Sequence, residues 1–528
     1  MLYFLSLACL IFFSACQKPS DRCKQTLRIN IESDPQTLDP RKARDLKTIT
    51  LMRMLFEGLT RVSPEGQTEL ALAEKVDVSD DQTRYVFHLR KSVWSNGEPV
   101  TSLDFAESWK SILDPEFPTD IANQLYPIKN ARKAKSGEIA LSQVGIETPD
   151  EKTLIVQLEA PTPYFLELAS LTSFFPVPRG PNSKWAQDPA SHIGNGPFSI
   201  RAWTHGDQVL LLANPLYWES GKVKMAEIEL FMVAPDTEMR MFEEGELDWA
   251  GSPLCTIPSD SIADLKEKNE LFVSPLSGTA FLRVNTSKDQ NKDPQDQGLL
   301  SNGNFRKALS FALDRQAITD HVLQGGYQPA WSLVPPEMGL VEADLLAEDA
   351  KFYFAKALKE LKLEGKPLKP LVISYKASSR NSILAQAIQQ QWEKVLGIKV
   401  ELEAVEPKVF FQRISKIDFE IILSDWIADF NDPINFLDVF KYKSGGTNCT
   451  HWESPKYIDL LNRSDLCGEE KQRKRLMKEA EAILMDEMPI IPIFHYVFNY
   501  MQNKKLENVV LSPIGQIDFR WAEMREIR

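Results

Sequence analysis

The chain has 528 residues, and its 43% of hydrophobic and 26% of charged residues are typical of a soluble globular protein. A chain of this length exceeds the size of one hydrophobic core, so two or three lobes are predicted. The net charge of −13 argues against nucleic-acid binding, which needs clustered Lys and Arg, and against adhesion to an anionic membrane surface.

The first sixteen residues, MLYFLSLACLIFFSAC, contain no charged side chain and are too few to span a bilayer. They are typical of the apolar region of a secretory signal, with small residues before Cys16. The ending of residues 1–16 resembles a bacterial lipobox, in which the cysteine is lipidated and becomes the mature N-terminus. A plain cleavable signal is the alternative. Residues 17–26 are then expected to form a polar tether, and no later segment is apolar enough to cross a membrane.

Four cysteines follow the signal, namely Cys23, Cys255, Cys449 and Cys467. An exported protein can form disulfides, and four cysteines allow three pairings. Cys449 and Cys467 are nearest in sequence, but a helix between them would hold them apart. Their spacing fits no metal site, and the sequence leaves the pairing open.

Short strands alternate with amphipathic helices along the first half of the chain. The patterns predict strands at 27–31, 85–89, 153–158 and 227–233, a buried strand at 209–213, and helices at 49–57, 105–112 and 236–243. Thr101 or Ser102 is suited to cap the helix at 105–112.

The second half continues this mixed pattern. It predicts helices at 305–323, 343–361 and 383–396 and strands at 371–375, 398–405, 419–424 and 490–500. The run of strand, helix and strand from 371 to 405 indicates a mixed α/β lobe. The buried strand at 419–424 leads into DWIADFNDP (residues 425–433), and the ends of such strands are where ligands of open α/β sheets bind.

Eight segments, in this order, resemble the oligopeptide-binding proteins of ABC importers. They are DPQTLDP (34–40), LFEGL (55–59), FHLRKSVWSNGEPVTSLDF (87–105), NGPFSI (195–200), GELDWA (245–250), FRKALSFALDR (305–315), LGIKVEL (396–402) and DWIADFNDP (425–433). The resemblance implies an α/β fold of the large periplasmic binding protein type, with three lobes around a hinge. Lobe I would combine residues 27–56, 186–278 and 496–528, lobe II would be 57–185, and lobe III would be 279–495.

The same resemblance implies an exported, periplasmic or cell-surface lipoprotein that captures short peptides in a closing cleft between lobes. Its partners would be the peptide and the permease of the importer, and it would touch the membrane through its lipid anchor only. A monomer without cofactor or metal is expected.

Asp429 is the main candidate for contact with a peptide. A receptor of broad specificity should fix the α-ammonium group with an enclosed carboxylate, and Asp429 matches the family position with this role. Trp426 and Phe430 would exclude water, and Ile427 and Ala428 could offer backbone groups. The alternative is that Asp429 only caps the turn that follows it.

Further contacts are implied by family positions at Arg44, Leu46, Gly251, Ser252 and Phe281. Leu423 stands where oligopeptide receptors often carry an Arg for the peptide carboxylate. Arg44 or Arg380 could replace that Arg, and the alternative for each is a solvated surface side chain.

No motif of a phosphate loop, a zinc protease, a nucleophile elbow or a redox CxxC pair is present, so no enzymatic activity is expected. Two other functions stay open. One is the same fold binding a glutathione-like peptide or a metal chelate. The other, from a different class, is an exported lipoprotein hydrolase.

Overall fold

The computed structural model describes residues 25–119, 121–179, 185–186, 189–287, 297–340, 349–444 and 446–525. The predicted signal and lipidation site at Cys16, the tether up to residue 24 and Cys23 lie outside these residues. The beginning of the predicted helix at 343–361 does so as well. Within the described residues, Cys255, Cys449 and Cys467 are free thiols.

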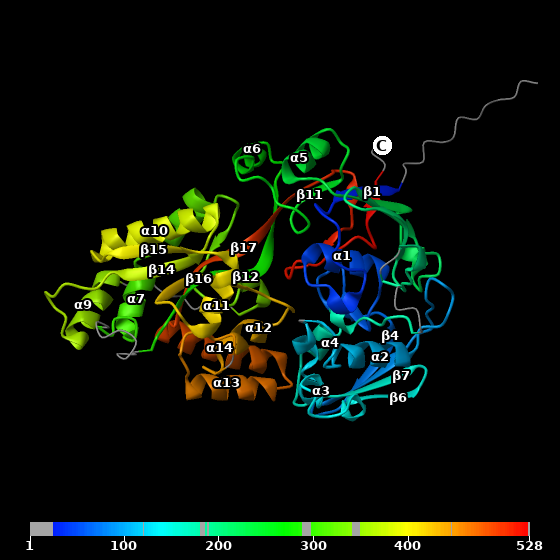
Figure 1. The fold of residues 1–528 in the computed structure, drawn as a ribbon, viewed down its shortest axis with the longest axis horizontal. Coiled ribbons are helices and arrows are strands. Elements are labelled where there is room, and N and C mark those ends of the chain that lie inside the picture. Colours follow the sequence, from blue (N-terminus) through cyan, green and yellow to red (C-terminus); the bar gives the residue numbers. More distant parts are fainter. Residues whose placement is uncertain are drawn as a thin grey trace, which may run out of the picture.

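One mixed sheet of eleven strands continues through both halves of the molecule (Figure 1). Its order is β15 (Val400–Val405), β14 (Leu371–Lys376), β16 (Ile421–Ile427), β12 (Phe272–Val284), β17 (Ile490–Gln502), β11 (Trp249–Gly251), β1 (Thr26–Asn30), β10 (Glu227–Phe231), β9 (Gln208–Ala213) and β8 (Phe198–Thr204), with β13 (Gln328–Pro329) on β17. The sheet therefore gives both halves a common backbone frame.

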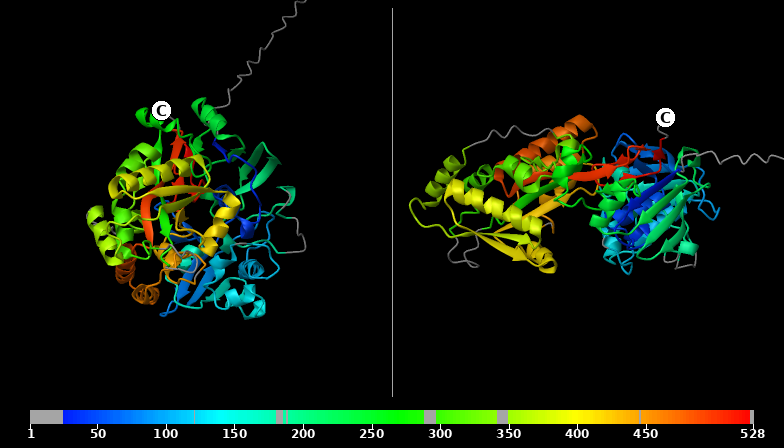
Figure 2. Two further views of the ribbon diagram at one scale, coloured as in Figure 1. Left: turned by 60° about the vertical axis from the view of Figure 1, so that its left-hand side comes forward. Right: turned by 90° about the horizontal axis from the view of Figure 1, so that it is seen from above.

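Strands β12 and β17 pass from one half to the other (Figure 2). Near one end, Phe272–Pro275 pair with Val497–Tyr500, and near the other, Thr279–Arg283 pair with Ile490–His495. The register shifts between Pro275 and Thr279. Because such irregularities bend a strand, this region is suited to act as a hinge.

The first half, on the right in Figure 1, contains both ends of the described chain. Gln25 and Met524 bind each other through two hydrogen bonds of 2.8 and 2.9 Å. The other elements of this half are α1 (Leu46–Leu55), α2 (Ser102–Ile112), α3 (Ala131–Lys135), α4 (Phe165–Leu168), α5 (Pro235–Glu243), α6 (Ile262–Glu267), the pair β2 (Thr60–Val62) and β3 (Thr68–Leu70), and the sheet of β4 (Ala73–Val78), β5 (Arg84–Leu89), β7 (Thr153–Gln157) and β6 (Ile146–Asp150). Two terminal hairpins, β18 (Leu506–Glu507) with β21 (Glu523–Met524) and β19 (Val510–Leu511) with β20 (Ile517–Asp518), complete it. Thr101 caps α2, which confirms one of the two predicted caps.

The second half packs helices against strands β14, β15 and β16 and against β12 and β17 (Figure 1). They are α7 (Gly303–Phe311), α8 (Arg315–Ala317), α9 (Ala350–Leu361), α10 (Ser379–Leu396), α11 (Pro407–Lys416), α12 (Ile434–Leu437), α13 (Pro455–Asp465) and α14 (Glu470–Glu487). The mixed α/β lobe predicted here is confirmed. The boundaries proposed for the three lobes stay a prediction.

Two predicted elements were wrong in detail. The helix expected at 305–323 ends at Phe311, and a separate turn of helix begins at Arg315. The strand at 209–213 was expected to be buried, but within it only Val209 and Leu211 are buried. Its other face is partly exposed, although β9 lies between β10 and β8 in the sheet, so the unbroken apolar run did not indicate burial on both faces.

Candidate functional site

Asp429 lies in the loop between strand β16 and helix α12. The side chain of Asn435, in α12, holds this loop in place. Its Oδ1 atom accepts hydrogen bonds from Trp426 Nε1 at 2.9 Å and from the Asp429 backbone N–H at 3.4 Å. The aromatic and acidic residues of the motif are thereby fixed relative to each other.

A cavity of about 350 Å³ surrounds the Asp429 side chain and is lined from both halves of the molecule. The first half contributes Asn123, Gln124, Tyr126, Pro127, Arg132, Tyr164 and Leu168, and the second contributes Trp426, Asp429, Phe430, Ile434, Asn435, Asp438, Val439 and Thr447. Asp429 is therefore exposed to solvent at a site where the two halves meet.

The carboxyl group of Asp429 has no cationic partner. It forms no ion pair with any residue in the described part of the chain, and Arg132 in the same cavity lies over the Tyr126 ring at 5.1 Å. The surrounding protein raises the pKa of Asp429 by desolvation, and a hydrogen bond from Asn435 partly opposes this shift. An ammonium group bound here would offset that desolvation.

The two halves already touch beside this cavity. The rings of Tyr164 and Phe430 stack with centroids 4.8 Å apart and planes 4° apart. Next to them, Arg473 binds Asp432 through two hydrogen bonds of 2.5 and 2.8 Å, and its guanidinium lies 5.7 Å from the Tyr164 ring. These contacts fix one wall of the cavity.

A second cavity, of about 340 Å³, adjoins the first, since Trp426 and Thr447 line both. Arg380, in the first turn of α10, lines it, with its guanidinium carbon 4.8, 5.5 and 5.4 Å from the rings of Tyr327, Phe494 and Tyr496. The positive end of a helix disfavours a cation in its first turn, and this turn contains no acidic residue. Arg380 is therefore placed where an anionic group would be stabilised.

The structure brings the other candidates together only in part. Ile427 is 43% exposed and Ala428 is buried, and neither lines either cavity. The Ala428 N–H donates to the Ser277 carbonyl oxygen at 2.8 Å. Phe281 is fully buried and packs against Phe440 in the core, so its side chain lines neither cavity.

Four candidates lie in the first half and line neither cavity: Arg44, Leu46, Gly251 and Ser252. The backbone of Ser252 is bonded to Asn499 on β17, at 2.9 Å. Gly251 has a φ of 90°, and a Cβ there would come within 2.7 Å of the Asn499 carbonyl oxygen. Both residues therefore belong to the connection between the halves.

Three residues that the sequence interpretation did not single out belong to the site: Asn435, Tyr164 and Lys376. Asn435 could have been found as the polar residue in the first turn of α12, six positions after Asp429. Tyr164 gave no signal, because more than 250 residues separate it from Asp429 in the sequence.

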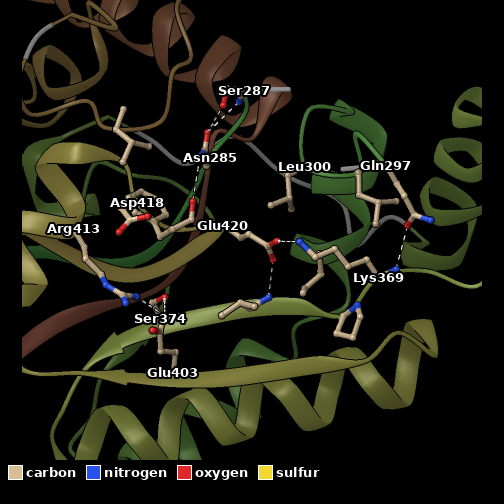
Figure 3. A pocket seen from close by; sticks show the side chains of 16 residues that line it. Asn285, Ser287, Gln297, Leu300, Lys369, Ser374, Glu403, Arg413, Asp418 and Glu420 are labelled. Atoms are coloured by element: carbon tan, nitrogen blue, oxygen red, sulfur yellow. Dashed lines mark hydrogen bonds and ion pairs between the residues drawn. The ribbon is translucent and has the colours of Figure 1, made fainter. Parts of the chain in front are cut away.

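Another cavity, of about 440 Å³, lies elsewhere in the second half (Figure 3). Four of its charged groups form two ion pairs: Lys369 contacts Glu420 at 2.8 Å, and Arg413 contacts Glu403 at 2.5 Å. None of the predicted site residues lines it. Both of its cations are therefore already paired with carboxylates, and we do not assign it as the candidate site.

The fold and the site together define a class of protein. Two halves that share a sheet through β12 and β17, with a cavity lined from both, have the architecture of the large periplasmic binding proteins. In agreement, the fold is similar to the unliganded open form of the periplasmic murein tripeptide-binding protein MppA, with a TM-score of 0.81 at 27% identity over 95% of this chain and 97% of that one. It is also similar to Haemophilus influenzae OppA in complex with the peptide RPPGFSPFR, with a TM-score of 0.74 at 26% identity over 95% and 99%.

Residues 67–448 match the family described as "Bacterial extracellular solute-binding proteins, family 5 Middle". The chain is 38% identical to the oligopeptide-binding protein OppA of Bacillus subtilis, over 96% of this chain and 94% of that one. It is 31% identical to the periplasmic OppA of Salmonella typhimurium, over 90% and 88%. The chain belongs to family 5 of the bacterial extracellular solute-binding proteins.

Proposed function

We propose that this chain is the substrate-binding component of an ABC importer and captures short peptides between its two halves. The observation that carries the proposal is Asp429, a carboxylate that pairs with no cation among the described residues and lines a cavity with walls from both halves. A free α-ammonium group is the cation that every unmodified peptide supplies. The relatives from Bacillus subtilis and Salmonella typhimurium are oligopeptide-binding proteins, which supports the same class of ligand.

The peptide would lie across both cavities. Its ammonium group would pair with Asp429, Trp426 would pack against it between the cavities, and its carboxylate would reach Arg380. Charge-assisted hydrogen bonds at both ends hold the features common to all peptides. Broad specificity follows, since neither contact depends on an internal side chain.

Replacement of Asp429 by Asn tests the proposal. The substitution keeps the shape but removes the charge that pairs with the ammonium group. A charged hydrogen bond contributes about 1.5–3 kcal/mol, so affinity for a free tetrapeptide should fall roughly 10- to 100-fold by calorimetry. N-acetylation of the peptide should weaken binding to the unmodified protein by a similar factor, and should matter little to Asp429→Asn.

The matched control is Asp459→Asn, which removes a carboxylate on the exposed face of α13, where Asp459 pairs with Arg463 at 3.3 Å. Its affinity should equal that of the unmodified protein. Equal affinity for free and N-acetylated peptides would contradict the role of Asp429.

Export and lipidation are proposed from the sequence of residues 1–16. In the described part of the structure, no helix is long and apolar enough to cross a bilayer. A lipid on Cys16 would then hold the protein at the membrane surface near its permease. Mass spectrometry of the mature protein should find a diacylglyceryl-modified Cys16 as the first residue, and a mature N-terminus at any other residue would contradict lipidation.

A further inference from the structure

The cavity beside Arg380 is lined by apolar side chains as well as by charged ones. We infer that it is a specificity pocket for the last residue of the peptide and selects a large apolar side chain there. The inference rests on the proposed peptide function and names the ligand class more narrowly.

The apolar surface consists of a buried floor and one exposed ring. Leu384, Phe410, Leu423 and Phe494 form the floor and are 2%, 5%, 6% and 1% exposed. Phe411 lines the same cavity and is 64% exposed. An aromatic ring left in water beside an apolar floor offers a surface that gains free energy when an apolar group covers it.

The charges of the pocket favour an anion. Arg283 is buried and donates to the carbonyl oxygens of Thr447 and Asn448 at 2.7 and 2.6 Å, and Asp425 is the acidic group that faces it. Asp425 also accepts a hydrogen bond from the Tyr496 hydroxyl at 3.3 Å.

The other two cations that line the pocket are Lys376 and Arg380. Neither forms an ion pair with a residue of the described ranges, and Lys376 Nζ lies 5.8 Å from the Phe411 ring. The exposed ring and the two unpaired cations are therefore parts of one pocket.

A carboxylate next to a large apolar side chain satisfies both features of the pocket. In a peptide, only the last residue offers this combination, because Asp and Glu carry a carboxylate without an apolar group. A free fatty acid has the same chemistry but lacks the ammonium group that Asp429 would bind. Because Asp429 would bind an ammonium group, the carboxylate and the apolar group in this pocket are expected to come from a peptide and not from a fatty acid.

Both ends of the proposed ligand are bound in the same half of the molecule. Asp425 lines the second cavity and Asp429 the first, and four residues of extended chain span at most about 14 Å. An extended tetrapeptide has a similar length. The terminal side chain is thus selected by the second half alone, whatever the position of the first half.

Calorimetry with Ala-Ala-Ala-Leu, Ala-Ala-Ala-Ala and Ala-Ala-Ala-Lys tests the inference. Leu adds three buried carbon atoms to Ala, so the Leu peptide should bind about tenfold or more tightly than the Ala peptide. The Lys peptide should bind no better than the Ala peptide, because Lys376 and Arg380 repel its side chain. Octanoate at the same concentration should not displace the Leu peptide.

Phe411→Ser should reduce the preference for Leu over Ala to a few-fold, because it removes the exposed ring of the pocket. Its control is Phe352→Ser, which removes a 60% exposed ring on α9 and should keep the full preference. Because both rings are exposed, both variants are expected to fold.

Three other results would contradict the inference or the proposed function. Equal affinity for the Leu and Ala peptides would overturn the specificity pocket while peptide binding itself stands. A full Leu preference in Phe411→Ser, or displacement by octanoate, would overturn the assignment of this cavity. Failure of every free peptide to bind would overturn the proposed function and, with it, the pocket.

Discussion

Glu238 is a buried carboxyl group next to the strand that connects the two halves. Its side chain is fully buried, and its oxygens accept hydrogen bonds from Asn30 Nδ2 and from the Gly251 N–H, both at 3.2 Å. Burial raises its pKa to about 7, although hydrogen bonds from Cys255, Asn30 and Gly251 oppose the shift. The folded protein therefore holds a proton here at a pH where the unfolded chain has lost it.

This shift predicts a loss of stability as the pH rises. Between the unfolded pKa of about 4.5 and the folded pKa of about 7, the folded state binds more protons, so the free energy of unfolding decreases with pH. Glu238→Gln cannot titrate and should lose about 1–3 kcal/mol less than the unmodified protein between pH 4.5 and 7.5. Urea unfolding at several pH values measures this difference.

The control is Glu243→Gln, on the exposed side of the same helix, α5. It should reproduce the pH dependence of the unmodified protein. Parallel pH profiles for Glu238→Gln and the unmodified protein would show that Glu238 ionises normally.

Among single residues, the sequence predicted those that lie close together in the chain. Asp429, Trp426 and Phe430 belong to one short motif, and all three line the first cavity. Their partner across the cavity, Tyr164, could not be predicted, because its stack on Phe430 depends on how two distant segments fold against each other. Phe281 was implied as a contact by its family position, but its side chain is buried in the core and lines neither cavity.

Among elements, helix α7 shows where periodicity fails. Apolar spacing continues from Phe305 to Leu323, yet α7 ends at Phe311, and Arg315 in the next turn of helix is only 2% exposed. Its guanidinium donates to the carbonyl oxygens of Pro492 and Ser310, both at 2.9 Å. A buried cation that needs backbone acceptors on a distant strand is a tertiary requirement, and local pattern cannot reveal it.

Asp314 starts the new turn of helix and gives a test at this scale. Its Oδ1 accepts from the Ala317 N–H at 2.9 Å, so Asp314→Ala should lower the free energy of unfolding by about 1 kcal/mol. Asp320→Ala removes an exposed carboxylate that contacts Gln316 at 2.8 Å and should cost less than about 0.5 kcal/mol. Equal urea midpoints for the two variants would contradict the cap.

For the whole molecule, the sequence predicted the class of fold, and the family resemblance implied how lobes combine. The local sequence pattern could not predict the strand order of the large sheet, because β1 pairs with β10 and β11, which lie some 200 residues away in the sequence. Such long-range pairing is set by packing of the whole chain. The same holds for Gln25 and Met524, which join the two ends of the described chain.

The arrangement of the halves predicts a change of shape on binding. The structure has a higher TM-score with the unliganded open form of MppA than with the peptide complex of OppA. Among the ring contacts of the described residues, the only stacked pair that links the halves beside Asp429 is Tyr164 with Phe430. A ligand shifts an open–closed equilibrium only by binding the closed form more tightly, and a peptide enclosed by both halves does so. The radius of gyration, measured by small-angle X-ray scattering, should therefore decrease when Ala-Ala-Ala-Leu is added at about ten times its Kd. At the same peptide concentration, Asp429→Asn should show a much smaller decrease in the radius of gyration. If calorimetry detects binding but the radius of gyration does not change, the halves do not close on the peptide.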